Sequence, residues 1–285
     1  MARIANAVLL LLAGTTFACD PGAVRHRVEF DSAHGLSANV FRPAESGPHP
    51  GVLLLHGGCF LHGSSDGLVS EARDLADQGF VAMTIDYRLA NAGGHFPEAI
   101  RDAKCAVRWL KSHAGDFDLD PGRVAVFGTS AGGYLAAMLG ATEDLPEFDR
   151  TSCGADVDAS VEAVVVLAGV SDWRTRCRSG MRTCEEIFLG ATCDPRALAP
   201  VFREASVVTY RDRVTVPHLL LHGVKDRDIP ITQSVLLREA LRSHGVDVEF
   251  HAIPGARHNF EREWDAPSAR EARRTITSFL RERLR

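Results

Sequence analysis

The stretch AVFGTSAGGYLAAML, residues 125–139, places Ser130 between glycines, with one apolar run before it and another after it. This pattern predicts a strand that turns sharply into a helix. Gly and Ser are common in ordinary turns, so the five residues around Ser130 are weak evidence by themselves. However, the spacing of Gly128, Ser130 and Gly132 matches a nucleophile elbow, in which small neighbours allow a strained serine between strand and helix. We therefore take Ser130 as a candidate nucleophile.

The sequence around this stretch alternates between two kinds of segment. Apolar runs, most of the later ones uninterrupted, are typical of strands buried on both faces of a sheet. They occupy residues 26–30, 37–41, 51–56, 81–87, 123–128, 161–169, 218–223 and 248–254. Amphipathic segments with helical spacing lie among them. These occupy residues 67–79, 96–115, 131–142, 231–245 and 267–284.

This order predicts an α/β fold with a mostly parallel central sheet of about eight strands and helices on both faces. The first two strands have no helix between them, so we expect an antiparallel entry. With 45% hydrophobic and 24% charged residues, the chain is ordinary for a globular protein, and we expect a single domain over residues 19–285. The net charge of −5, without a basic block, gives no indication of nucleic-acid binding.

A serine hydroxyl needs a general base to take its proton, and the base needs an acid to orient it. His258 follows the last predicted strand, and Asp226 follows the strand before it. The order Ser130, Asp226, His258 is that of an α/β-hydrolase triad. Asp228 is the rival acid; we favour Asp226 because it comes at the turn just beyond the strand. The alternative for His258 is a solvated loop histidine, which we would favour if it stood alone, since the chain has twelve histidines.

Acyl transfer also requires donors for the developing oxyanion. The glycine turn after the strand at 51–56 can present the backbone N–H groups of Gly58 and Cys59, and Ala131 adds the N–H next to the nucleophile. A tight turn without a role is the alternative. His56 and His222 each follow a strand directly, and we expect both to be structural.

The N-terminus has the layout of an export signal. Arg3 precedes an apolar run that is too short to span a bilayer, and small residues precede Cys19. We expect residues 1–18 to be this signal. The end of the segment partly resembles a bacterial lipobox, so lipidation at Cys19 and simple secretion both remain open. Any membrane association is expected only through that anchor.

Cysteine usage agrees with export. Beyond Cys19, six cysteines remain, and an oxidising compartment favours their pairing, with 15 possible connectivities. Free buried thiols are the alternative. No pair of cysteines or histidines has the spacing of a structural zinc site, so we expect no metal. The six are Cys59, Cys105, Cys153, Cys177, Cys184 and Cys193.

The chain resembles the α/β-hydrolase superfamily, and within it the esterase/lipase group near the BD-FAE and hormone-sensitive-lipase-like families. The resemblance is carried by HGGCF, DYRLA, FPEAIRDAKCAVRWL, FGTSAGG, LHGVKDRDIP and GARHNF, which together span most of residues 50–260. It implies a serine carboxylic ester hydrolase with the triad Ser130, Asp226 and His258, and no cofactor. The HGGG oxyanion motif of these families maps onto residues 56–59, where Cys59 replaces the last glycine. We hypothesise that a disulfide to Cys105 compensates by fixing this loop.

The resemblance leaves the substrate open, because the fold serves many hydrolases. A polar, cysteine-rich insertion at about 171–212 is the expected lid and acyl-pocket wall, unlike the apolar lid of an interfacial lipase. We therefore expect a short-chain or aryl ester, with a carbohydrate as one option for the alcohol. The alternatives are a peptidase or amidase of the prolyl-oligopeptidase type, and a non-catalytic surface binding protein. The sequence does not fix the oligomeric state.

Overall fold

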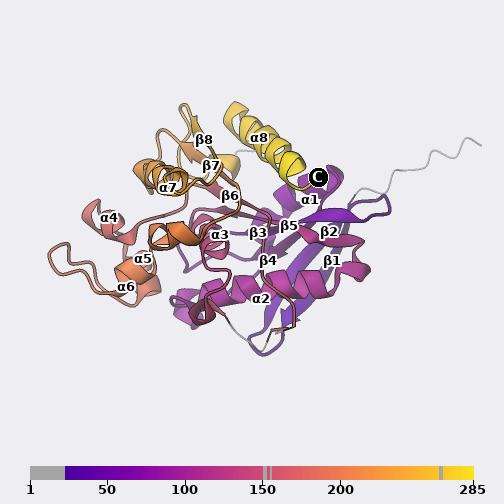
Figure 1. Ribbon diagram of the computed structural model, residues 1–285, viewed down its shortest axis with the longest axis horizontal. Helices are drawn as coiled ribbons and strands as arrows, with labels where there is room; N and C mark the ends of the chain where they lie inside the picture. Colours follow the sequence, from indigo (N-terminus) through magenta and orange to yellow (C-terminus); the bar gives the residue numbers. More distant parts are fainter. Residues whose placement is uncertain (1–22, 150–152, 155, 263–265) are drawn as a thin grey trace, which may run out of the picture.

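The computed structural model describes residues 23–149, 153–154, 156–262 and 266–285. The predicted export signal and Cys19 lie outside the described residues. The strands form one eight-stranded sheet in the order β1-β2-β4-β3-β5-β6-β7-β8 (Figure 1). They are β1 (Val24–Asp31), β2 (Leu36–Arg42), β3 (His49–Leu55), β4 (Val81–Ile85), β5 (Leu119–Thr129), β6 (Ala163–Leu167), β7 (His218–Gly223) and β8 (Val248–Ile253).

Strand β2 pairs antiparallel with both β1 and β4, and every later pairing in the sheet is parallel. The predicted α/β fold, with its mostly parallel sheet and antiparallel entry, is therefore confirmed. The α-helices are α1 (Val69–Asp77), α2 (Glu98–Ser112), α3 (Ala131–Ala141), α4 (Trp173–Arg178), α5 (Thr183–Leu189), α6 (Val201–Glu204), α7 (Thr232–Arg242) and α8 (Pro267–Arg283).

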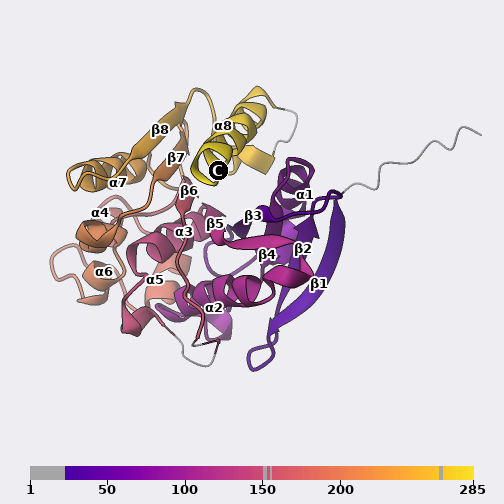
Figure 2. The same ribbon diagram turned by 45° about the vertical axis from the view of Figure 1, so that its right-hand side comes forward.

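Helices cover both faces of the sheet, as Figure 2 shows, with α1 and α8 on one face and α2 and α3 on the other. Alternation along β3 explains why both faces are apolar. Leu53 and Leu55 belong to the core under α2, α3 and α7, whereas Val52 and Leu54 belong to the core under α1 and α8. The continuous apolar run at 51–56 is thus shared between two cores.

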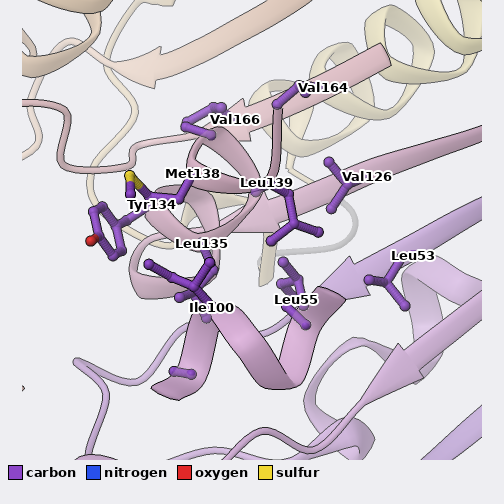
Figure 3. Packing of buried hydrophobic residues seen from close by; sticks show 14 of the residues in the cluster. Leu53, Leu55, Ile100, Val126, Tyr134, Leu135, Met138, Leu139, Val164 and Val166 are labelled. Atoms are coloured by element: carbon purple, nitrogen blue, oxygen red, sulfur yellow. The ribbon is translucent and has the colours of Figure 1, made fainter. Parts of the chain in front are cut away.

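The larger core holds the helix that follows Ser130. Helix α3 is buried along its whole length, and its leucines meet strand residues such as Leu55 and Val126 (Figure 3). Since α3 is apolar all round, it can only lie between the sheet and other elements. This packing fixes the first turn of α3 against the carboxyl ends of the central strands.

The segment between β6 and β7 contains α4, α5, α6 and the 3₁₀ helix η5 (Val207–Arg213). It includes the range 171–212 that the sequence marks as an insertion. Figure 1 shows α4, α5 and α6 gathered at one end of the molecule, far from β1. Within the described residues, no helix combines the length and the apolar character needed to cross a membrane.

Candidate active site

Ser130 occupies the turn between β5 and α3 with φ 56° and ψ −118°. A non-glycine residue at positive φ costs roughly 1–3 kcal/mol, and such strain persists only where the surroundings impose it. A Cβ on Gly128 would lie 2.0 Å from the carbonyl oxygen of Gly132, and a Cβ on Gly132 would lie 2.0 Å from that of Leu55. Both positions therefore require glycine, as the elbow pattern implies.

The structure brings the three predicted triad residues together. The Ser130 Oγ lies 2.8 Å from His258 Nε2, and His258 Nδ1 lies 2.6 Å from Asp226 Oδ2. Both contacts are satisfied when the imidazole carries its proton on Nδ1, so that Ser130 donates to Nε2 and Nδ1 donates to Asp226. The Asp226 side chain is fully buried, while Ser130 retains 8% of its surface. This arrangement can accept the serine proton and hold the resulting positive charge.

Asp226 is the acid that contacts His258, and its rival Asp228 is not. Burial raises the pKa of Asp226, but hydrogen bonds from His222 and His258 outweigh burial and hold that pKa below its usual value. Its other oxygen accepts the backbone N–H groups of Asp228 and Ile229, each at 2.9 Å. Asp228 is half exposed and pairs instead with Arg182 at 3.3 Å. Asp226 is therefore a carboxylate at neutral pH.

The two histidines expected to be structural are both buried and bonded to backbone. His222 lies 2.9 Å from the Ile229 carbonyl oxygen and 2.8 Å from Ser234 Oγ. His56 Nδ1 lies 2.7 Å from the Gly57 carbonyl oxygen, and its ring stacks on Tyr87. Burial lowers the pKa of His56, which favours its neutral form. Neither ring contacts the Ser130 hydroxyl.

The backbone N–H groups of three residues that line the pocket beside Ser130 are candidates for an oxyanion hole. Gly58, Cys59 and Ala131 all line this pocket, and among the described residues none of their N–H groups donates to a protein acceptor. Ala131 opens α3, where the helix dipole favours negative charge. Gly58 and Cys59 have φ values of 126° and 53°. These amides can stabilise an oxyanion that forms next to the serine.

The disulfide hypothesised between Cys59 and Cys105 is wrong. Cys59 pairs with Cys184 at the start of α5, with 5.8 Å between their Cα atoms, and Cys105 pairs with Cys153. The reason is placement: Cys105 is buried on α2 beneath the sheet, whereas Cys59 lies on the loop after β3. The disulfide partner of Cys59, the residue that replaces the last glycine of the motif, therefore comes from the insertion. Cys59 itself has a left-handed conformation that a Cβ disfavours.

A pocket of about 280 Å³ opens at Ser130. The insertion forms one wall through Arg182 and Glu185, and the loops that carry Asp228 and His258 form others. A second disulfide, Cys177–Cys193, closes the insertion on itself. The loop after β3, which carries Gly58 and Cys59, is called the oxyanion loop here. Phe188 of α5 stacks on Phe60 of this loop, with ring centroids 3.8 Å apart. The insertion is therefore bonded and packed to the oxyanion loop.

One cluster has the donor types of a metal site, since ligand atoms of Asp226, Asp228 and His258 lie within 4.8 Å of one another. These three side chains already make other contacts. Asp226 accepts hydrogen bonds on both oxygens, and Asp228 pairs with Arg182. The arrangement fits a hydrogen-bonded triad better than a metal centre.

A model of the BD-FAE family matches residues 39–241, more than half of the chain. The chain belongs to the BD-FAE family. The dienelactone hydrolase family model matches the overlapping segment 200–283. The first match includes Ser130 and Asp226, and the second includes Asp226 and His258. The resemblance inferred from the motifs is thereby confirmed.

Relatives of this BD-FAE member include esterases. Esterase LipC of Mycobacterium tuberculosis is 32% identical over 84% of this chain and 62% of LipC. The ethyl acetate hydrolase of Pseudomonas putida is 30% identical over 80% of this chain and 72% of that protein. The chain spans 62%, 55% and 44% of the first three curated relatives, which are all mycobacterial. A truncated carbohydrate esterase from gut microbiota superposes with a TM-score of 0.81 at 22% identity, covering 93% of this chain and 98% of the other, which confirms the α/β-hydrolase fold.

Sequence reasoning missed a glutamate behind the nucleophile of this BD-FAE protein. The Thr129 hydroxyl donates to Glu261 Oε1 at 2.8 Å, which links the strand before Ser130 to the segment after His258. Glu261 is almost fully buried, and burial raises its pKa. Its position three residues after His258 is the only sequence signal. The Arg182–Asp228 ion pair was also missed, because its partners are 46 residues apart.

Proposed function

We propose that this protein is a serine carboxylic ester hydrolase that acts on short-chain esters through an acyl-enzyme. The contacts from Ser130 to His258 and from His258 to Asp226 carry this proposal. Membership of the BD-FAE family and the relatives named as esterases support it. The same chemistry requires no cofactor.

The proposed reaction has two steps. The Ser130 hydroxyl gives its proton to His258 Nε2 while its oxygen attacks the ester carbonyl carbon. The negative charge on the carbonyl oxygen is stabilised by the amides of Gly58, Cys59 and Ala131. His258 returns the proton to the leaving alcohol as the ester bond breaks. Water then attacks the acyl-enzyme by the same route and releases the acid.

The volume of the pocket and the disulfide that holds its wall in place favour a short acyl chain. A volume of about 280 Å³ next to Ser130 suits a small ester, and the wall formed by the insertion is joined to Cys59 by a disulfide. Such a wall differs from the apolar, movable lid of an interfacial lipase. The relative named for ethyl acetate hydrolysis also supports a short chain.

The test is hydrolysis of p-nitrophenyl esters from acetyl to palmitoyl by the oxidised protein. We expect activity on acetyl to butyryl esters and a loss of about 10⁴-fold or more in kcat for Ser130→Ala, because Ser130 supplies the attacking oxygen of the proposed reaction. Circular dichroism should show that the variant is folded. Retention of most activity would refute the role of Ser130. Hydrolysis of p-nitroanilides in preference to esters would instead favour an amidase.

We further propose that the protein works outside the cytoplasm. The pattern of residues 1–18 motivates this, with Cys19 as either a lipidated or a simply cleaved boundary. Three disulfides support an oxidising compartment. Fractionation of expressing cells, with radiolabelled palmitate incorporation compared between wild type and Cys19→Ser, would separate a lipidated from a secreted protein. Recovery of the full-length chain only in the cytoplasm would exclude both.

A further inference from the structure

The charged residues around the pocket are unevenly paired. Glu185 contacts the buried Arg176 through both oxygens and also accepts the backbone N–H of Arg182. Asp228 pairs with the Arg182 side chain across the mouth of the pocket. Both acidic residues of the pocket lining are therefore neutralised by arginines. Arg262 also lines the pocket, and among the described residues it forms no ion pair.

Arg262 lies at the end of η6 (Phe260–Arg262), the short segment that follows His258. It is exposed, and within the described part of the chain no carboxylate lies in ion-pair distance of its guanidinium. Among the described carboxyls, Glu71 and Glu261 interact electrostatically with Arg262. Burial raises the pKa of Glu71 to about 7 and also raises the pKa of Glu261. These carboxyls therefore compensate the charge of Arg262 only in part.

An arginine that lines the pocket of a reactive serine and has no ion-pair partner there has a specific chemical use. A guanidinium offers a planar fork of donors that matches a carboxylate, and it keeps its charge at every working pH. The loop after β3 contributes His62 to the same lining, and an imidazole carries no negative charge. Arg262 is thus the one charged side chain of the described pocket lining that has no ion-pair partner, so its guanidinium is free to bind an anion.

We propose that Arg262 is a specificity residue that binds a carboxylate carried by the ester substrate. The preferred substrate would then be an anionic ester, with the carboxylate on either the acyl or the alcohol half. This inference rests on the proposed ester hydrolysis and adds to it a substrate class. Arg262 lies outside the Ser130, His258 and Asp226 hydrogen bonds, so its loss should leave neutral esters unaffected.

Matched ester pairs test the proposal in two arms. In the acyl arm, the 4-nitrophenyl monoester of succinate is compared with its neutral methyl ester. In the alcohol arm, 4-acetoxybenzoate is compared with 4-acetoxybenzamide. We expect kcat/KM to favour the anionic member about tenfold in one arm, mainly through KM, and the preference to shrink as salt rises. A wild-type ratio at or below one in both arms would overturn the proposal.

Three variants assign the preference to the residue. Arg262→Gln should abolish the preference while leaving the rate on neutral esters within about twofold, and Arg262→Lys should retain part of it. Arg257→Gln is the control for net charge, because Arg257 is an exposed arginine on the same loop that does not line the pocket. An equal loss of preference in Arg257→Gln would contradict a local contact.

Binding separates failure of this inference from failure of the proposed function. Calorimetry with Ser130→Ala should detect tighter binding of 4-acetoxybenzoate or of the succinate monoester than of its neutral partner. The additional change Arg262→Gln should remove that difference. If wild type hydrolyses no ester but these binding differences appear, the anion site stands and the ester hydrolase assignment fails. Equal binding of both members in each pair would refute the anion site whatever the hydrolysis shows.

Discussion

The elbow at Ser130 and the insertion between β6 and β7 both border the pocket, but different contacts hold them in place. The elbow is held by close backbone packing within the sheet, since Gly128 packs against the backbone of Gly132, and Gly132 packs against that of Leu55 on β3. The insertion is held by contacts to remote segments, namely the Cys59–Cys184 disulfide, the Phe60–Phe188 stack and the Arg182–Asp228 ion pair. Disrupting the packing of the elbow should therefore destabilise the whole fold. Removing one contact of the insertion should weaken its attachment only in part.

The largest effect is expected at the elbow. Gly132→Ala adds a Cβ 2.0 Å from the Leu55 carbonyl oxygen and 2.6 Å from that of His56, so the backbone has to shift. We expect a loss of at least about 3 kcal/mol in the free energy of unfolding, measured by denaturant titration, together with loss of esterase activity.

Gly122→Ala is the matched control, because its Cβ would meet only the Asp120 side chain at 3.4 Å, an ordinary contact. It should cost less than about 1 kcal/mol. If Gly132→Ala proved as stable as this control, the close packing assigned to the elbow would be wrong.

An intermediate effect is expected from the disulfide that joins the two regions. Replacing both Cys59 and Cys184 by serine frees the oxyanion loop, and the kcat for a short-chain p-nitrophenyl ester should fall about 10- to 100-fold. The free energy of unfolding should also fall, because this bridge closes a sequence separation of 125 residues.

The Cys177–Cys193 pair supplies the comparison within the insertion. Its double serine variant should lose stability while keeping kcat within about threefold, since neither cysteine borders the oxyanion amides. Equal losses of kcat in the two double variants would mean that the whole insertion, and not the bond at Cys59, orients the loop.

The smallest effect is expected from the ion pair. Arg182 and Asp228 are each about half exposed, so Arg182→Gln should lower the free energy of unfolding by less than about 1 kcal/mol. A double-mutant cycle with Asp228→Asn measures their coupling. A coupling above about 2 kcal/mol would mean that the ion pair contributes as much to the free energy of unfolding as the disulfide does. It would contradict the ranking of the contacts that hold the insertion.

The contrast also explains what could be predicted from sequence. The strand and helix around Ser130 are recognisable because apolar periodicity and glycine spacing are local, and the chain order of Asp226 and His258 follows from successive strand ends. The parallel sheet follows from the same alternation. Asp226 was separable from Asp228 by its place directly after β7.

Contacts between remote segments were not accessible in this way. Cys59 and Cys184 lie far apart in sequence, and six cysteines allow 15 pairings without any local preference. The choice of Cys105 failed because its helix faces the core under the sheet, which only the packed fold reveals. The Thr129–Glu261 hydrogen bond depends on the same packing, since its partners are 132 residues apart.

The Cys59–Cys184 disulfide has a further consequence for integrity of the chain. It closes a covalent ring that contains Ser130 but neither Asp226 nor His258. A protease cut between Cys153 and Cys184 would put the nucleophile on one fragment and its base on the other. The bridge would still keep the fragments as one molecule, visible as a single band until a reductant is added. Nicked protein can therefore retain a complete triad in an oxidising environment.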